Sequence, residues 1–110
     1  MTDKRIVLTI AGSHEEAQKI ARGLVERRLA ACVNIVPGVE SIYRWQGKVD
    51  SAQEWLLVIK TTSRAFDGVR AAIQELHIYE LPECVCVAIE DGSTRYLDWI
   101  GSCVGVEGGG

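Results

Sequence analysis

The first third of the chain passes from a continuous apolar run to a segment with helical periodicity. Residues Arg5–Ala11 are almost all aliphatic or β-branched, which predicts a strand buried on both faces. Ser13 follows, with Glu16 three residues later, and this spacing predicts a helix that begins with a capping box. Arg27 and Arg28 fall in the last turn expected for the helix, where basic side chains suit the helix dipole. The apolar stripe of this helix consists of Ala17, Ile20, Ala21, Leu24 and Val25.

A long interrupted strand and its return strand come next. Residues Cys32–Val36 predict the start of the strand, and Pro37 with Gly38 predicts a bulge or bend, because proline has no amide hydrogen for a central ladder. The pattern resumes at Val39 and turns back at Gly47, which predicts a long hairpin. The return strand is apolar on both faces, with Trp55, Leu57 and Ile59 on one and Leu56, Val58 and Lys60 on the other.

The last third predicts a helix, a strand and a short final helix. Ser63 is the expected N-cap of the helix, and residues 77–82 form a loop, because Pro82 disfavours helical geometry at the residue before it. Residues 84–89 predict the fourth strand, and residues 94–100 a final helix that Gly101 ends. The apolar stripe of the first of these helices consists of Phe66, Val69, Ile73 and Leu76.

The resulting β-α-β-β-α-β order predicts an α+β fold, a ferredoxin-like sandwich in which the second and third strands form a long hairpin and a short helix follows at the C-terminus. The length of 110 residues predicts a single domain over residues 1–104, followed by a flexible glycine-rich tail over residues 105–110. The two helices that connect the strands are expected on one face of the sheet, yet the return strand is apolar on both faces. The simplest cover for the second face is another copy of the chain.

The composition of the chain limits which partners and which cellular location can be expected for the protein. The net charge of −3, without a clustered basic face, argues against nucleic acid as a partner. No apolar run reaches the roughly 18 residues of a membrane span, and the charged N-terminus has no signal-peptide core, so we expect a soluble cytoplasmic protein. The four cysteines, at positions 32, 84, 86 and 103, are expected to be reduced and structural, because their spacing matches neither a zinc site nor an easy disulfide.

One histidine has surroundings that suggest chemistry. His77 lies at the predicted end of a helix, in a loop that also carries Tyr79, Glu80 and Glu83. The imidazole and the two carboxylates could hold Cu²⁺ or Zn²⁺ weakly, although a histidine at a helix C-terminus is also explained by the helix dipole. His14, on the polar side of the first helix, is expected to face solvent.

Aromatic and charged side chains also gather around the predicted hairpin. Tyr43, Arg44, Trp45 and Glu54 are expected near one another across the two strands, and Lys60 extends from the return strand. Together with Tyr79 they could line a cleft for a small anionic ligand. The alternative is simple interface packing of the aromatic rings, with Lys60 paired to a carboxylate. The chain has no nucleophile elbow, phosphate-binding loop, zinc-protease motif or dinucleotide fingerprint, so we expect no enzymatic activity and no obligatory cofactor.

Four segments together carry a family resemblance. The run AACVNIVPGVESIYRWQGKV at residues 30–49 resembles the most characteristic segment of the CutA family, the divalent-cation tolerance proteins. The segments IKTT at residues 59–62, YELPE at 79–83 and YLDWI at 96–100 match further motifs of that family in order and spacing. The resemblance covers residues 6–100 and implies a compact homotrimer with clefts between its subunits.

The resemblance also bears on copper binding. In some CutA proteins copper has been associated with adjacent histidines before the YELPE-like motif and with a cysteine on the first strand. Here only His77 matches, since Leu76 and Thr9 occupy the other ligand positions and Ile78 replaces the usual proline. We therefore expect a trimeric, non-catalytic protein of divalent-cation (copper) tolerance. The alternatives are a small-molecule-sensing trimer with intersubunit clefts, and a stable scaffold for an unknown protein partner.

Overall fold

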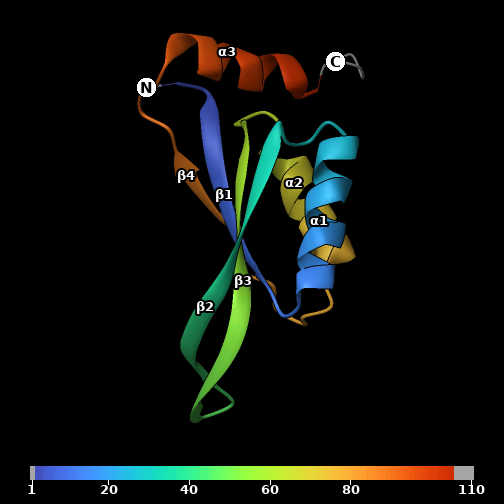
Figure 1. Cartoon of the computed structure of the whole chain (residues 1–110), viewed down its shortest axis with the longest axis vertical. Helices are drawn as coiled ribbons and strands as arrows, with labels where there is room; N and C mark the ends of the chain where they lie inside the picture. Colours follow the sequence, from blue (N-terminus) through green and yellow to red (C-terminus); the bar gives the residue numbers. More distant parts are fainter. Residues whose placement is uncertain (1, 106–110) are drawn as a thin grey trace.

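The computed structural model describes residues 2–105 as one sheet with three helices (Figure 1). Because each strand runs antiparallel to its neighbours, in the order β2-β3-β1-β4, the predicted α+β class is confirmed. Of the predicted glycine-rich tail, residues 106–110 lie outside the described residues. In chain order the elements are β1 (Lys4–Ala11), α1 (His14–Glu26), β2 (Cys32–Trp45), β3 (Lys48–Thr62), α2 (Phe66–Leu76), β4 (Val85–Ala88) and α3 (Thr94–Cys103).

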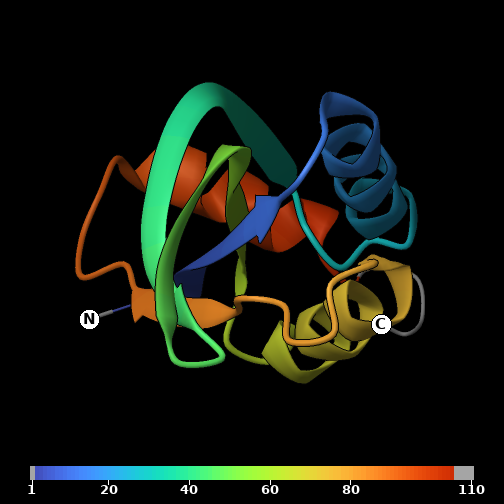
Figure 2. The same cartoon turned by 90° about the horizontal axis from the view of Figure 1, so that it is seen from below.

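Helices α1 and α2 lie side by side against one face of the sheet, as predicted (Figure 2). The side chains that point toward them alternate with those that point away, since successive residues of a strand face opposite sides. Val7 of β1 and Ile59 of β3 are directly paired and fully buried on the helix side. The core between the two layers contains Val7, Ala11, Ala17, Ile20, Ala21, Leu24, Ala30, Leu57, Ile59, Val69, Ala72 and Ile73.

The ends of α1 agree with the prediction at its start and differ at its finish. The Ser13 hydroxyl oxygen accepts a hydrogen bond from the Glu16 amide at 3.1 Å, as expected for the N-cap. The helix ends at Glu26, so the prediction that Arg27 and Arg28 lie in its last turn is wrong. Arg28 has a φ of 59°, a left-handed conformation that reverses the chain and brings Ala30 into the core.

The hairpin of β2 and β3 forms as predicted, including its irregularity. The register shifts between Val36 and Val39, which confirms a bulge at the proline–glycine pair, and Gly38 has a φ of +76°. In the turn, φ is 51° at Gln46 and 81° at Gly47. The flanking residues Trp45 and Lys48 pair with each other. Positive φ at both turn residues is typical of the two-residue hairpin turns that match strand twist.

Three predicted boundaries in the last third were wrong. Helix α2 begins at Phe66, so its N-cap is Ala65 and not Ser63, and the methyl side chain of Ala65 cannot accept a hydrogen bond. The Ala65 amide itself donates to the Thr62 hydroxyl oxygen at 3.3 Å. Strand β4 is shorter than predicted, since β1 offers it pairing only from Arg5 to Leu8. Helix α3 continues past Gly101 to residue 103, because no left-handed residue or proline interrupts it there.

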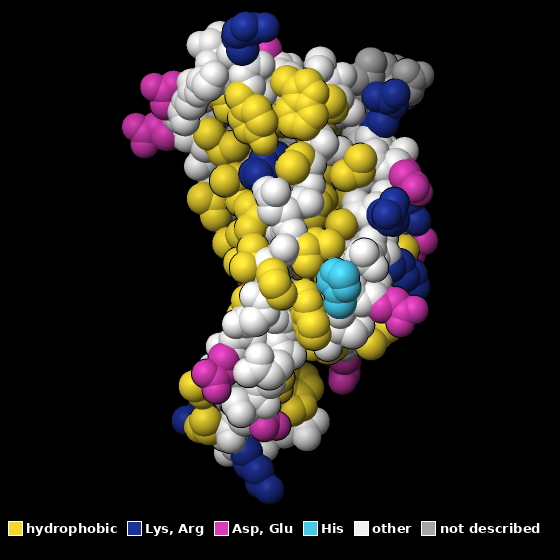
Figure 3. Space-filling view, in the orientation of Figure 1, with side chains coloured by type: hydrophobic (Ala, Val, Ile, Leu, Met, Phe, Trp, Pro, Cys, Tyr) yellow, Lys and Arg dark blue, Asp and Glu magenta, His cyan; other side chains and the backbone are white. Residues whose placement is uncertain are grey.

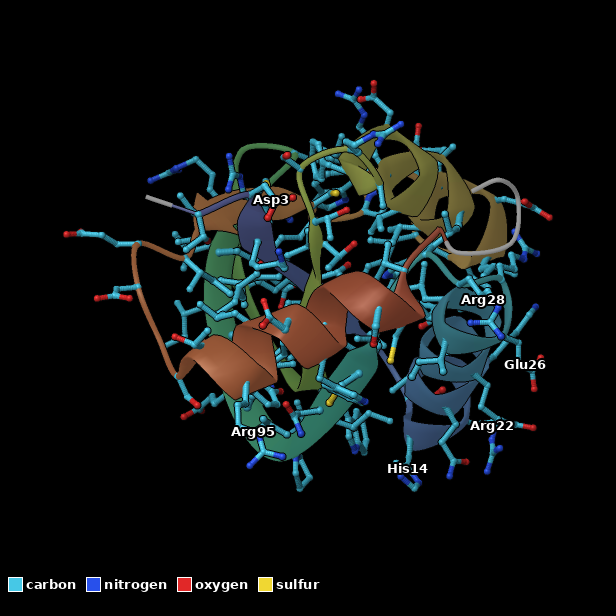
Figure 4. The ribbon with its side chains drawn as sticks, turned by 90° about the horizontal axis from the view of Figure 1, so that it is seen from above. Asp3, His14, Arg22, Glu26, Arg28 and Arg95 are labelled. Atoms are coloured by element: carbon cyan, nitrogen blue, oxygen red, sulfur yellow. The ribbon has the colours of Figure 1, made fainter. Side chains whose placement is uncertain are left out.

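Helix α3 lies across the end of the sheet where β1 begins (Figure 1). Its Ile100 is fully buried, whereas Tyr96 and Trp99 remain 43% exposed. Viewed from above, the labelled side chains of His14, Arg22 and Glu26 project outward from α1, and Arg28 lies just beyond the end of this helix (Figure 4). Among residues 2–105, no helix combines the length and the apolarity needed to cross a bilayer.

The glycine inside α3 gives a test of this boundary. We expect Gly101→Ala to raise the free energy of unfolding by about 0.5–1 kcal/mol, because alanine is the better helix former. The nearest obstacle to its Cβ is Lys4 Cε at 3.3 Å, the far end of a flexible side chain. Gly38→Ala is the control, and it should destabilise because φ is +76° there. Denaturant unfolding measures both, and a destabilised Gly101→Ala would contradict the helical assignment.

Candidate functional site

A cavity of about 660 Å³ lies between the outer part of the hairpin and the loop that follows α2. Four of the residues predicted for a ligand cleft line it: Tyr43, Trp45, Glu54 and Tyr79. The loop also contributes Glu80 and Glu83, which sequence analysis had assigned to a metal site. The other lining residues are Ile10, Ser41, Ile42 and Leu81.

The two remaining residues predicted for the cleft do not line this cavity. Lys60 is six positions from Glu54 on the same strand, which separates them by about 20 Å. Its ammonium group donates a hydrogen bond to the Asn34 side-chain oxygen on the neighbouring strand. Arg44 lies near the tip of the hairpin and is exposed. Within one chain, therefore, neither predicted cation faces the cavity.

The wall of the cavity is fixed by a hydrogen bond between Tyr79 and Glu54. The Tyr79 hydroxyl donates to Glu54 Oε2 at 2.5 Å and so joins the loop to the hairpin. Burial, followed by the hydrogen bond to Glu54 and its charge, raises the pKa of Tyr79 well above its ordinary value. Gly12 makes room for this ring, because a Cβ there would lie 2.6 Å from the tyrosine oxygen. The phenol thus stays protonated and acts as a donor at neutral pH.

A buried carboxylate holds the start of the loop in place. Glu16 is 7% exposed, and its two oxygens accept hydrogen bonds from the Gly12 amide at 3.0 Å and the Ile78 amide at 2.8 Å. The sequence pattern predicted Glu16 as a capping residue but not its hydrogen bond to the loop. The capping-box spacing was the available signal, yet the partner is 62 positions away and cannot be read from local spacing.

His77 is held in the same network and is 8% exposed. Its Nε2 donates to the Ile10 carbonyl oxygen, so the neutral ring carries its proton there, and Nδ1 accepts from the Tyr79 amide at 3.1 Å. Glu16 Oε2 lies 3.3 Å from Nδ1. In this arrangement neither ring nitrogen offers a free lone pair, so a metal ion would have to displace one of these hydrogen bonds.

The structure does not gather the predicted metal ligands around one point. Glu80 and Glu83 line the cavity, while the two nitrogens of His77 are occupied by backbone groups. Among residues 2–105, no group of three or more His, Cys, Asp or Glu side chains is arranged to hold a metal ion. Metal binding through His77, Glu80 and Glu83 therefore stays a prediction.

The cysteines form no disulfide in the described chain, in agreement with the expected free thiols. Cys32, Cys84 and Cys103 are half-buried and Cys86 is exposed. Burial raises the pKa of the Cys84 thiol, so the thiol form is favoured over the reactive thiolate at neutral pH.

Similarity to known proteins agrees with this architecture. The chain matches the family model of the CutA1 divalent ion tolerance protein over residues 5–103. The Thermus thermophilus divalent-cation tolerance protein CutA is 52% identical over 97 residues, which cover 88% of this chain and 94% of that protein. The chloroplastic CutA protein of Arabidopsis thaliana is 41% identical over 95 residues, which cover 86% of this chain but 52% of the plant protein.

A solved structure gives the same result in three dimensions. The divalent cation tolerance protein of Thermus thermophilus superposes with a TM-score of 0.91 at 50% identity, covering 93% of this chain and 99% of that one. The chain belongs to the CutA1 divalent ion tolerance family, as its four sequence motifs predicted.

The Glu16 network can be tested by a substitution that preserves shape. In Glu16→Gln, one amide hydrogen would face a side-chain NH₂ group instead of an acceptor, so we expect a loss of roughly 1–3 kcal/mol in unfolding free energy. Hydrogen exchange at the Ile78 amide should also accelerate. Glu15→Gln is the matched control, because it removes a charge from the same helical turn and its side chain makes no hydrogen bond within residues 2–105. Equal effects of the two substitutions would contradict the role of Glu16.

Proposed function

We propose that this protein serves divalent-cation tolerance as a non-catalytic homotrimer of ferredoxin-like subunits. Membership of the CutA1 family supports the tolerance role. The observation that carries the trimer is the sheet face turned away from α1 and α2, which is apolar and which these helices leave open. Residues paired directly across antiparallel strands share a face, so this surface can be assigned from the register.

The open face runs across all four strands. Ile6 pairs with Val87 and Leu8 pairs with Val85, and the two valines are 43% and 48% exposed. Hydrophobic side chains gather over the strands between α3 and the hairpin (Figure 3). An apolar surface of this kind on a small domain is typical of a protein interface. Its apolar members are Ile6, Leu8, Ile10, Val36, Leu56, Val58, Val85 and Val87.

The outer hairpin supports a second copy of the chain as the occupant. Strand β1 pairs with β3 only from Trp55 to Thr62, so the ladder from Val39 to Glu54 has just two strands. An isolated two-stranded hairpin is marginally stable in water. Ile42 and Val49 on this arm are 70% and 66% exposed, so the arm gains stability if it packs against another subunit.

The metal role is the finer part of the proposal. We propose that Cu²⁺ or Zn²⁺ binds weakly, with His77 as the main ligand and Glu80 or Glu83 assisting. The weakness has a structural reason, since His77 must first give up a hydrogen bond to Ile10 or Tyr79. A cytoplasmic location fits the four free thiols, because a reducing compartment keeps them unpaired.

One observation favours a second function. The cavity at the hairpin has the size of a small-ligand pocket, which supports the alternative of a small-molecule sensor. A scaffold for an unknown protein partner would need only the stable assembly. We propose no nucleic-acid partner, because the net charge of the chain is −3.

Light scattering tests the assembly. The wild-type chain at micromolar concentration should give three times the chain mass. Val87→Asp should weaken association at least tenfold, because an unpaired carboxylate on the open face would be buried between subunits. Val25→Asp on α1 is the control, since Val25 is 41% exposed in the single chain against 43% for Val87. A monomeric wild type, or equal behaviour of the two variants, would contradict the trimer.

Calorimetric titration with Cu²⁺ and Zn²⁺ tests the metal site. The wild type should show weak saturable binding, which His77→Ala abolishes and Glu80→Gln or Glu83→Gln reduces, because an imidazole and a carboxylate supply the ligands. Glu15→Gln should leave the affinity unchanged, and circular dichroism checks that each variant is folded. Binding that is unaffected by His77→Ala would place the metal elsewhere.

A further inference from the structure

The cavity at the hairpin combines acidic and aromatic walls. The ten described residues that line it include three glutamates and three aromatic residues, and none of the ten is lysine or arginine. A cleft lined by one sign of charge focuses the field and attracts ions of the opposite sign. The lining of this cavity therefore favours a cation and disfavours the anionic ligand that the sequence suggested.

Glu54 supplies a negative charge that no side chain within residues 2–105 neutralises. It is 7% exposed, and within residues 2–105 no Lys, Arg or His lies at ion-pair distance from it. Its Oε2 accepts from Tyr79, while Oε1 has no hydrogen-bond partner among the described residues. Because every fully buried side-chain oxygen or nitrogen in that part of the chain has a partner, Oε1 is not fully buried, and Glu54 lines the cavity. A nearly buried carboxylate without a counter-charge is unfavourable unless a ligand provides one.

Glu83 adds a second acidic group to the same cavity. It lines the cavity together with Glu54. Two carboxylates around one space repel each other. A positive charge between them would relieve this repulsion.

The spacing of these groups distinguishes an organic cation from a metal ion. A metal ion needs several ligand atoms within about 2–2.6 Å of a single point. Among the described residues, no three His, Cys, Asp or Glu side chains converge in this way. Tyr43 and Trp45 add aromatic walls, which attract ammonium groups at distances up to about 6 Å from the ring centre. Dispersed carboxylates and aromatic rings suit an extended ligand with ammonium groups on a carbon chain.

We propose that the cavity between the hairpin and the loop binds an aliphatic amine with one or more ammonium groups. Glu54 is the main counter-charge, Glu83 and Glu80 hold further positive charge, and Tyr43 and Trp45 pack against the carbon chain. This binding goes beyond metal tolerance. The amine site shares Glu80 and Glu83 with the proposed metal site, but it does not use His77, which does not line the cavity.

Three four-carbon probes that differ in charge test the proposal. The full-length assembled protein is titrated in a calorimeter with putrescine, butanediol and succinate, in the presence of a metal chelator. Putrescine should bind saturably, with an affinity at least tenfold higher than the neutral diol or the dianion. Spermidine, with a third ammonium group, should bind more tightly than putrescine.

Matched variants assign the binding to the cavity. Glu54→Gln keeps the side-chain shape and an acceptor for Tyr79, and it should weaken putrescine binding at least tenfold without changing the mass of the assembly. Glu83→Gln should weaken it less, and it serves as the test if Glu54→Gln does not fold. Glu15→Gln, remote from the cavity on α1, should bind like the wild type.

The proposal is overturned if putrescine binds no better than butanediol, or if Glu54→Gln and Glu15→Gln bind it equally. Absence of putrescine binding from a stable trimer would also overturn it, because a second copy would then fill or close the cavity. The chelator keeps this result separate from the metal titration, so the two proposals can fail independently.

Discussion

Strand β3 is apolar on both faces, and one layer of helices can cover only one of them. Leu57 and Ile59 are fully buried beneath α1 and α2, while Leu56 and Val58 point to the other side of the sheet. Burial of apolar surface stabilises a fold by roughly 25 cal/mol per Å², so a small domain with an open apolar face forgoes part of its stabilisation. The same constraint explains why the subunit, with its projecting two-stranded arm, suits an oligomer better than a monomer.

The end of the molecule that contains the cavity depends on a few buried polar contacts between distant segments. The Glu16 carboxylate on α1 accepts a hydrogen bond from the Ile78 amide, and the Tyr79 hydroxyl donates one to Glu54 on β3. These bonds hold the loop after α2 against both the helix and the hairpin, and the cavity lies between the loop and the hairpin. Buried hydrogen bonds are individually modest, but leaving one partner unsatisfied is unfavourable by roughly 1–3 kcal/mol. The loop is therefore fixed by polar geometry more than by apolar packing, since Ile78 and Leu81 are 77% and 74% exposed.

Charge in the cavity changes the interpretation of the predicted ligand cleft. The hairpin pattern predicted Tyr43, Trp45 and Glu54 near one another, and these residues do lie around one space together with Tyr79 of the loop. Lys60 does not join them, because it sits six positions further along the strand, beside Asn34. Without that lysine, glutamates dominate the lining, and the favoured ligand changes from an anion to a cation. The expectation of an anionic ligand therefore rested on the predicted position of a single charged residue, Lys60.

The sequence by itself determined the elements, the hairpin with its bulge at Gly38, most of the core stripes and the family, because periodicity, turn residues and motif spacing are local properties. Val25 of the predicted α1 stripe is an exception, since it is 41% exposed. The sequence placed several helix ends wrongly: Arg27 lies beyond α1, Ser63 does not cap α2, and Gly101 lies inside α3. Such boundaries are set by competing backbone partners, which local patterns do not specify. Only the tertiary structure decided that the nitrogens of His77 are occupied and that Glu16 reaches the loop. It alone decided that Glu54 has no counter-charge among residues 2–105. Each of these depends on which groups from distant parts of the chain meet at hydrogen-bonding distance, and folding alone brings those groups together.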